Sequence, residues 1–187
     1  MNKWTFPTQI YAGPDSLNRL TAFSNESILI ICDPFLKDSP SLTYVMGLMD
    51  SKNKVTIYTD VVPDPPITHV VKGIEFMEGI KPTVIIAIGG GSCIDMSKGM
   101  AYFGRKLKHM DIKSFIAVPT TSGTGSEVTS FAVLTDSETQ IKYPLVDDAV
   151  LPDEALLTPL FVKTSPPSVT AFSGMDVLVH ALEAYVA

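Results

Sequence analysis

Four short, almost continuously hydrophobic runs place the strongest limit on the fold of this chain. They are SILIIC, KVTIYT, TVIIAI and SFIAVP, at residues 27–32, 54–59, 83–88 and 114–119. Such runs are typical of strands that are buried on both faces, as in a parallel sheet covered by helices. Helical patterns lie between or beside them, at residues 14–23, 67–80 and 92–103. This alternation predicts a doubly wound α/β domain with a parallel sheet.

The pattern changes after residue 127. Two strand-like runs flank a polar turn at Asp136–Thr139, so we expect a β-hairpin there. From residue 153 onward the chain is dense in proline and carries short helical pieces. We therefore expect a domain boundary near residue 155, with an α/β domain at residues 1–155.

Composition argues against several kinds of partner. The net charge is −6 and no basic run is present, so we expect no nucleic-acid partner. The N-terminus lacks the apolar segment of a signal peptide, and the longest apolar runs are far too short to cross a membrane. The two cysteines are widely separated and form no CxxC pair. That usage suits reduced thiols, so the expected location is the cytoplasm.

The segment VIIAIGGGSCIDMSKGM joins a buried strand, three glycines and the start of a helix. Glycines let a backbone turn sharply and approach a ligand closely, and the free N–H groups of a helix start suit a pyrophosphate. We expect Ser92 to cap this helix, with Asp95 as its capping-box partner. A tight turn without a ligand is the simpler alternative, but three glycines exceed what a turn needs.

Asp33 follows the first apolar run, at the end of a predicted strand. Its carboxylate can accept hydrogen bonds from ribose hydroxyls and repel a 2′-phosphate, which favours NAD over NADP. The order differs from the G-x-G-x-x-G fingerprint, in which the acid comes about 20 residues after the glycines. The alternative role for Asp33 is to cap the helix that follows.

A second loop, VPTTSGTGSEVT at residues 118–129, follows another buried strand. Its serine and threonine hydroxyls can hydrogen-bond an anion or a ribose. Open α/β sheets bind ligands at the carboxyl ends of their strands, so two such loops together favour a ligand site. Lys142, in the predicted hairpin, can supply a cation there, although most lysines in such positions are only solvated.

Asp176 and His180 lie four residues apart in a predicted helix, so their side chains share one face. A carboxylate with an imidazole suits Fe(II), Zn(II) or Mn(II). A catalytic zinc normally has three protein ligands, and such a pair alone is more often a surface contact. We expect His69 and His109 to be ordinary surface residues.

Three segments, GGGSCIDMSK, PTTSGTGSEVT and SGMDVLVHALEAY, resemble the iron-containing (group III) alcohol dehydrogenase family in their order and spacing. The resemblance extends from about residue 4 to the last residue. It implies an NAD-dependent oxidoreductase that interconverts a primary alcohol, or a short diol, and its aldehyde by hydride transfer. Fe(II), or zinc in its place, would polarise the substrate oxygen.

The resemblance also implies a role for particular residues. The cofactor-binding residues would be Asp33, Gly90, Gly91, Ser92, Thr120, Thr121 and Lys142, and the first two metal ligands Asp176 and His180. No catalytic residue is expected beyond the metal ligands. Asp64 stands where the family often has asparagine. Family members are also much longer, and their helical domain supplies two further histidine ligands.

The resemblance therefore implies that residues 156–187 are the truncated start of that all-helical domain. The difference in length predicts a fragment with an incomplete metal site and reduced or absent activity. The apolar residues of the last helix have no later helix to cover them, so we expect a homo-oligomer, a dimer or larger. Two other functions stay open: a non-catalytic nucleotide-binding or assembly module, and a superfamily relative similar to glycerol dehydrogenase or dehydroquinate synthase.

Overall fold

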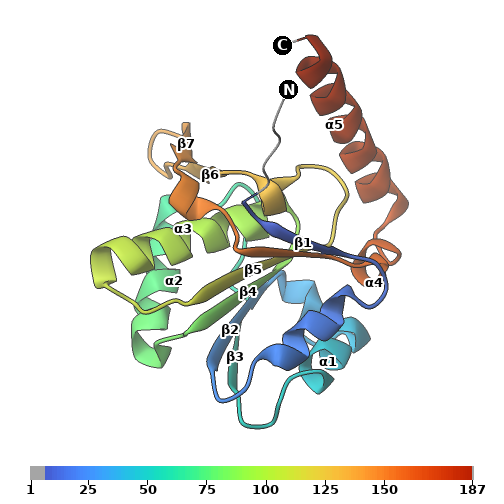
Figure 1. Ribbon diagram of the computed structural model, residues 1–187. Coiled ribbons are helices and arrows are strands. Elements are labelled where there is room, and N and C mark those ends of the chain that lie inside the picture. Colours follow the sequence, from blue (N-terminus) through green and yellow to red (C-terminus); the bar gives the residue numbers. More distant parts are fainter. Residues whose placement is uncertain (1–6, 187) are drawn as a thin grey trace, which may run out of the picture.

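The computed structural model describes residues 7–186, and it confirms the predicted α/β architecture with a parallel sheet (Figure 1). Neighbouring strands of this six-stranded sheet all pair in parallel. Their order across the sheet is β1 (Gln9–Ala12), β8 (Glu154–Leu157), β5 (Ser114–Pro119), β4 (Val84–Gly89), β2 (Ser27–Cys32) and β3 (Lys54–Tyr58). The four apolar runs therefore form four adjacent strands.

The helices follow the strands in the expected alternation. They are α1 (Pro40–Gly47), α2 (Ile67–Ile80), α3 (Gly91–Lys108), α4 (Pro159–Val162) and α5 (Pro167–Val186). Short 3-10 turns are η1 (Ser16–Ala22), η2 (Pro34–Leu36), η3 (Ser126–Val128) and η4 (Asp148–Val150). The helix expected at 67–80 is α2, and the one expected at 92–103 lies within α3. The segment at 14–23 forms the 3-10 helix η1 instead of an α-helix.

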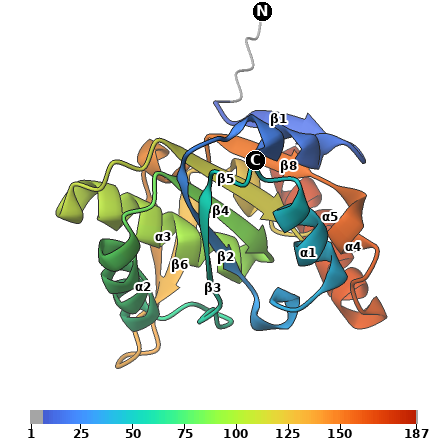
Figure 2. The ribbon, with the colours of Figure 1, turned by 90° about the horizontal axis from the view of Figure 1, so that it is seen from below.

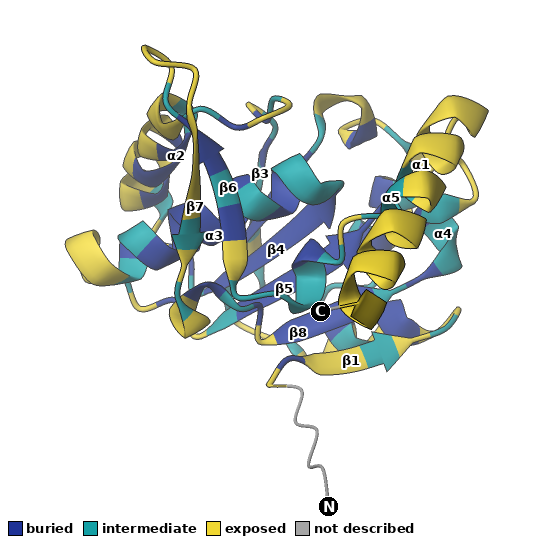
Figure 3. Cartoon of the chain, turned by 90° about the horizontal axis from the view of Figure 1, so that it is seen from above, coloured by how far each residue is buried: buried dark blue, intermediate teal, exposed yellow. Residues whose placement is uncertain are grey.

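Alternate residues of the central strands pack on opposite faces of the sheet, because successive side chains of a strand point in opposite directions. In β2, Leu29 and Ile31 belong to a core with α2 and α3, whereas Ile28 and Ile30 belong to a core with η1 and α1. Figure 2 shows helices on both sides of the sheet, and Figure 3 shows the central strands as buried. Burial on both faces explains the continuous apolar runs.

The predicted β-hairpin is present. Strands β6 (Phe131–Thr135) and β7 (Lys142–Val146) pair in antiparallel register, with Thr135 opposite Lys142. The Thr135 N–H donates to the Pro65 carbonyl at 2.9 Å, and Pro66 forms a parallel bridge with Thr135. These contacts hold the hairpin beside the segment that leads into α2.

Strand β8 corrects one expectation, since the sequence predicted short helical pieces from residue 153 onward. Residues Glu154–Leu157 are instead a strand between β1 and β5. Glu154 is buried and accepts a hydrogen bond from the Arg19 side chain at 2.6 Å, so its charge interrupts the apolar pattern that marks the other strands. The division at residue 155 into two domains stays a prediction, and residues 1–6 and 187 lie outside the described part.

Helix α5 leaves the body of the molecule, and none of its described residues is buried (Figure 1, Figure 3). It approaches the second loop closely at one point. A side-chain carbon added at Gly123 would lie 2.9 Å from the Ser173 Cβ. Within residues 7–186, none of the helices combines the length and the apolar character that crossing a membrane requires.

Candidate functional site

The carboxyl ends of β2, β4 and β5 meet at one edge of the sheet and form a cleft there. Its volume is about 450 Å³. Four of the residues expected at the cofactor line this cleft: Asp33, Gly90, Thr120 and Thr121. The rest of its lining is mainly apolar: Phe35, Leu36, Phe161, Pro166 and Val169, with Thr164 and Ser165. The cleft therefore combines a few polar groups with a mainly apolar lining.

The start of α3 corrects the expected helix cap. Gly90, and not Ser92, is the N-cap residue, and it makes no side-chain capping hydrogen bond. Asp95 does not complete a capping box, because its carboxylate accepts hydrogen bonds from the Ser126 hydroxyl and the Val133 N–H. The first N–H groups of a helix have no partner within it, so an uncapped start can bind an anion.

The three glycines of the loop have different reasons to be glycine. A Cβ at Gly89 would lie 2.4 Å from the Cys93 Cβ, and one at Gly91 would lie 2.7 Å from the Thr124 Cγ2. Packing alone therefore excludes a side chain at those two positions. A Cβ at Gly90 would come no closer than 3.6 Å to any atom outside its immediate neighbours, at Thr121. The protein's own packing leaves space beside Gly90, on the wall of the cleft.

Asp33 connects the end of β2 to the glycine loop. Its Oδ2 accepts a hydrogen bond from the Gly90 N–H at 3.4 Å. Asp33 is also the N-cap residue of η2, as the alternative role expected, but its side chain makes no capping hydrogen bond there. Burial raises the pKa of the Asp33 carboxyl, and the Gly90 N–H partly opposes that rise. A half-buried acid at this position can accept hydrogen bonds from hydroxyls that enter the cleft.

Ser92 and Lys142 are not among the residues that line this cleft, yet a single residue connects them. The Lys142 Nζ forms an ion pair with the Asp64 Oδ1 at 2.7 Å. The Asp64 N–H in turn donates to the Ser92 hydroxyl at 3.3 Å. The structure thus places the lysine of the hairpin beside the first turn of α3, with a carboxylate between them.

Asp176 and His180 line a separate hollow of about 560 Å³. The Asp176 Oδ1 and the His180 Nε2 are 3.8 Å apart. Two ligand atoms on one metal ion, each bonded at about 2.0–2.2 Å, can be separated by no more than roughly 4.4 Å, so this pair fits two positions of a coordination sphere. Among residues 7–186, no group of three or more His, Cys, Asp or Glu residues is placed to hold a metal.

The opposite wall of that hollow contains Asp95, Thr124, Ser126, Thr129, Phe131 and Val133. A buried lysine that the sequence analysis missed holds this wall in place. The Lys98 Nζ donates to the Thr129 carbonyl at 2.8 Å, the Thr129 hydroxyl at 3.1 Å and the Phe131 carbonyl at 2.5 Å. Burial lowers the pKa of Lys98 to about 8. The sequence signal that could have revealed this lysine is the pair Asp95 and Lys98, three residues apart and about one helical turn after the glycines.

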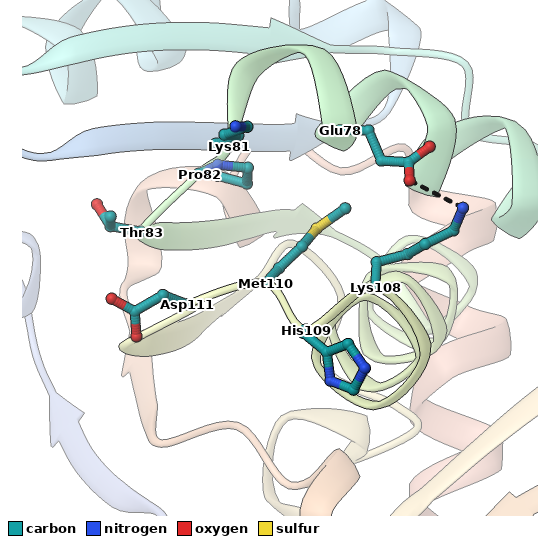
Figure 4. A pocket seen from close by; sticks show the side chains of 8 residues that line it. All are labelled: Glu78, Lys81, Pro82, Thr83, Lys108, His109, Met110 and Asp111. Atoms are coloured by element: carbon teal, nitrogen blue, oxygen red, sulfur yellow. Dashed lines mark ion pairs between the residues drawn. The ribbon is translucent and has the colours of Figure 1, made fainter.

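Neither His69 nor His109 is among the residues that line the cleft. His69 is only partly exposed and its Nε2 lies 3.7 Å from the Asp60 carboxylate, so its expected place on the surface is only partly correct. His109 is exposed, as expected. It lines a hollow of about 610 Å³ between the C-terminal ends of α2 and α3, where Glu78 and Lys108 form an ion pair at 2.8 Å (Figure 4). This hollow lies at the start of β4, and the glycine loop lies at its end.

Comparison with protein families identifies one match. Residues 7–159 match the family described as iron-containing alcohol dehydrogenase. The matched part contains the glycine loop, the second loop and the hairpin, and it ends before α5.

Three known proteins illustrate the similarity. The chain is 45% identical to a 1-propanol dehydrogenase of Citrobacter freundii over all of its own length and 50% of that protein. It is 39% identical to an NADPH-dependent butanol dehydrogenase of Clostridium saccharobutylicum, over all of the chain and 52% of that protein. A crystal structure of sulfoacetaldehyde reductase from Bifidobacterium kashiwanohense in complex with NAD+ superposes with a TM-score of 0.83 at 30% identity, covering 95% of this chain and 51% of that one. The chain thus spans about half the length of these relatives.

Proposed function

The chain belongs to the iron-containing alcohol dehydrogenase family, and from that premise we propose that its cleft binds NAD for the interconversion of an alcohol and an aldehyde. The proposed substrate is a primary alcohol or a short diol. Relatives named 1-propanol dehydrogenase and butanol dehydrogenase support that class of substrate. The partners of the chain in this proposal are therefore the dinucleotide and a small alcohol or aldehyde.

The observation that carries the proposal is the space at Gly90. A methyl group would fit there without a clash in the free protein, so packing does not explain the glycine. The same residue is the uncapped N-cap of α3 and lines the cleft. A pyrophosphate lying against this position would accept hydrogen bonds from the backbone N–H groups of the helix start. That contact requires the close approach which only glycine permits.

Asp33 supports NAD as the preferred form of the cofactor. Its carboxylate lies on the cleft and contacts the glycine loop, where it can accept from the two hydroxyls of an adenosine ribose. A 2′-phosphate would place a second negative charge near it, which costs binding energy in a partly buried site. One relative is named NADPH-dependent and one matched structure contains NAD+, so preference between the two forms belongs to this proposal.

Four further predicted residues divide into two groups in this proposal. Thr120 and Thr121 lie on the cleft and would hydrogen-bond the dinucleotide, while Asp176 and His180 would hold a divalent metal, Fe(II) or zinc. When bound, the nicotinamide carries the hydride, and the metal polarises the substrate oxygen as a Lewis acid. The chain's own contribution is to hold the two groups on either side of the second loop, which lines both hollows.

Calorimetric titration of the chain with NADH tests the cofactor part of this proposal. We expect heat of binding from the unaltered chain and about tenfold weaker binding from Gly90→Ala, because the added methyl group occupies the space that the pyrophosphate needs. Gly79→Ala is the matched control, since a Cβ at Gly79 in α2 has open space around it. Thermal unfolding of Gly90→Ala should match that of the unaltered chain.

Two results would contradict the proposal: no binding of NADH by the unaltered chain, or equal binding by Gly90→Ala. A different result separates the alternatives. If the chain binds NADH but neither binds a divalent metal nor supports alcohol-dependent reduction of NAD, the chain acts as a nucleotide-binding module without chemistry of its own.

A further inference from the structure

We propose that Asp64 is a built-in competitor of the nucleotide's phosphates, because its carboxylate holds the ammonium group of Lys142 beside the glycine loop. This inference rests on the proposed function, in which a dinucleotide lies against that loop. The proposed function names residues that strengthen nucleotide binding, and this inference adds one that weakens it. The starting observation is the ion pair between the Lys142 Nζ and the Asp64 Oδ1 at 2.7 Å.

The position of Asp64 is set by its backbone. Its N–H donates to the Ser92 hydroxyl at 3.3 Å, which places it at the first turn of α3. The next residue, Pro65, accepts a hydrogen bond from the Thr135 N–H at 2.9 Å, and Thr135 is the partner of Lys142 in the hairpin. Asp64 also adopts a left-handed conformation, with φ of 48°. The backbone of Asp64 therefore stays between the helix start and the hairpin of Lys142 whether or not the ion pair forms.

The ion pair itself is exposed and easily exchanged. The side chains of Lys142 and Asp64 are 56% and 65% exposed. Exposed ion pairs contribute little free energy, so a phosphate with a higher charge density can replace Asp64 as the partner of the lysine. A lysine side chain is long and flexible, so its ammonium group can turn from Asp64 toward an anion at the start of α3.

Charge around the loop decides the direction of the effect. The Asp33 carboxylate accepts a hydrogen bond from the Gly90 N–H, and the Asp64 backbone N–H donates to the Ser92 hydroxyl, so both acids lie close to the loop. A pyrophosphate bound at the loop would experience repulsion from both carboxylates and attraction from Lys142 within a Debye length of about 10 Å. Removal of the Asp64 charge should therefore strengthen binding of any ligand that carries phosphates. It should not affect a ligand without them.

The experiment compares ADP with adenosine, two ligands that differ only in their phosphates. We expect Asp64→Asn to bind ADP about fivefold more tightly than the unaltered chain at low salt, and to bind adenosine equally well. The asparagine keeps the size of the side chain and the backbone N–H to Ser92. At 0.5 M salt the gain should disappear, because exposed charges are then screened.

Two further variants test the role of Lys142. Lys142→Met should weaken ADP binding, and Asp64→Asn should give a smaller gain in a chain that also carries Lys142→Met, since the direct repulsion is relieved but no lysine remains to be released. Asp60→Asn is the matched control: it removes the same charge four residues earlier, from an acid that contacts His69. It should leave the affinity for ADP unchanged.

The outcomes separate this inference from the proposed function. If the unaltered chain binds ADP and NADH but Asp64→Asn brings no gain for ADP, the inference is wrong and the proposed function stands. An equal gain for ADP and adenosine would also overturn it, because that pattern indicates a change of shape and not of charge. If the unaltered chain binds neither ADP nor NADH, the proposed function itself fails.

Discussion

Helices α3 and α5 have similar lengths, 18 and 20 residues, but they differ sharply in their packing. α3 lies on the sheet and buries residues from Cys93 to Gly104, including Lys98. α5 buries none of its described residues, and Phe172, Leu178 and Leu182 stay exposed. α3, which would bind the pyrophosphate, is thus packed firmly within the described part of the chain. α5, which carries the proposed metal ligands, meets the rest of that part mainly at the second loop.

The two halves of the proposed site, the cleft at the glycine loop and the Asp176–His180 pair, are therefore held in place by different parts of the structure. The nucleotide cleft is built by strands whose order and register are complete among the described residues. The Asp176–His180 pair is fixed by helix geometry alone, since positions four apart share a face wherever the helix lies. An oligomer that covers the apolar residues of α5 is still a proposal. Sedimentation at micromolar concentration tests it, and a single monomeric species would count against it.

The largest expected effect is on stability. Ile86→Ala, in the middle of β4, should lower the free energy of unfolding by about 3 kcal/mol, because Ile86 is fully buried and its loss leaves a cavity. Leu178→Ala, in α5, should change it by less than about 0.5 kcal/mol, since that side chain is 52% exposed. Urea denaturation of both variants measures the difference. Similar losses would show that α5 is part of the same cooperative core.

A smaller effect is expected on metal binding. His180→Ala should weaken binding of Fe(II) or Zn(II) by about tenfold or more, because it removes one of the two ligand side chains, while NADH binding changes little. Equilibrium dialysis with metal analysis, beside calorimetry with NADH, measures both. His109→Ala is the matched control, since His109 is exposed at the opposite edge of the sheet. Equal loss of metal and NADH would contradict the separation of the two halves.

The smallest expected effect concerns Lys98 and pH. Burial lowers the pKa of Lys98 from its usual 10.5 to about 8. Between those values the unfolded chain keeps a proton that the folded chain has released, so the contribution of Lys98 to stability rises with pH in this window. From pH 8 to pH 9 the gain should be roughly 1 kcal/mol, relative to Lys98→Met.

Urea denaturation of the unaltered chain and of Lys98→Met at both pH values measures this difference. The substitution also removes three hydrogen bonds, so the variant will be less stable at each pH, but only the change between the two pH values reports the proton. Parallel pH profiles for the two proteins would show that the pKa of Lys98 is not lowered.

Much of the fold followed from local patterns. The apolar runs predicted β2, β3, β4 and β5, and the helical spacing of residues 67–80 matched α2. β8 escaped prediction because it is short, contains the buried Glu154 and is a strand only through its neighbours β1 and β5. For the site, the sequence placed Asp33, Gly90 and the second loop at one edge of the sheet, and the structure brings them to one cleft.

By itself, the sequence determined the alternation of strands and helices, the edge at which glycines end a strand, and the shared face of Asp176 and His180. These features depend on residues close together in the chain, so period and residue type are enough to predict them. Only the tertiary structure decided that Gly90 is the N-cap of α3, that Lys98 is buried beneath residues 129–131, and that Asp64 lies between Ser92 and Lys142. Each depends on contacts between distant segments, because the sheet order determines which loops meet.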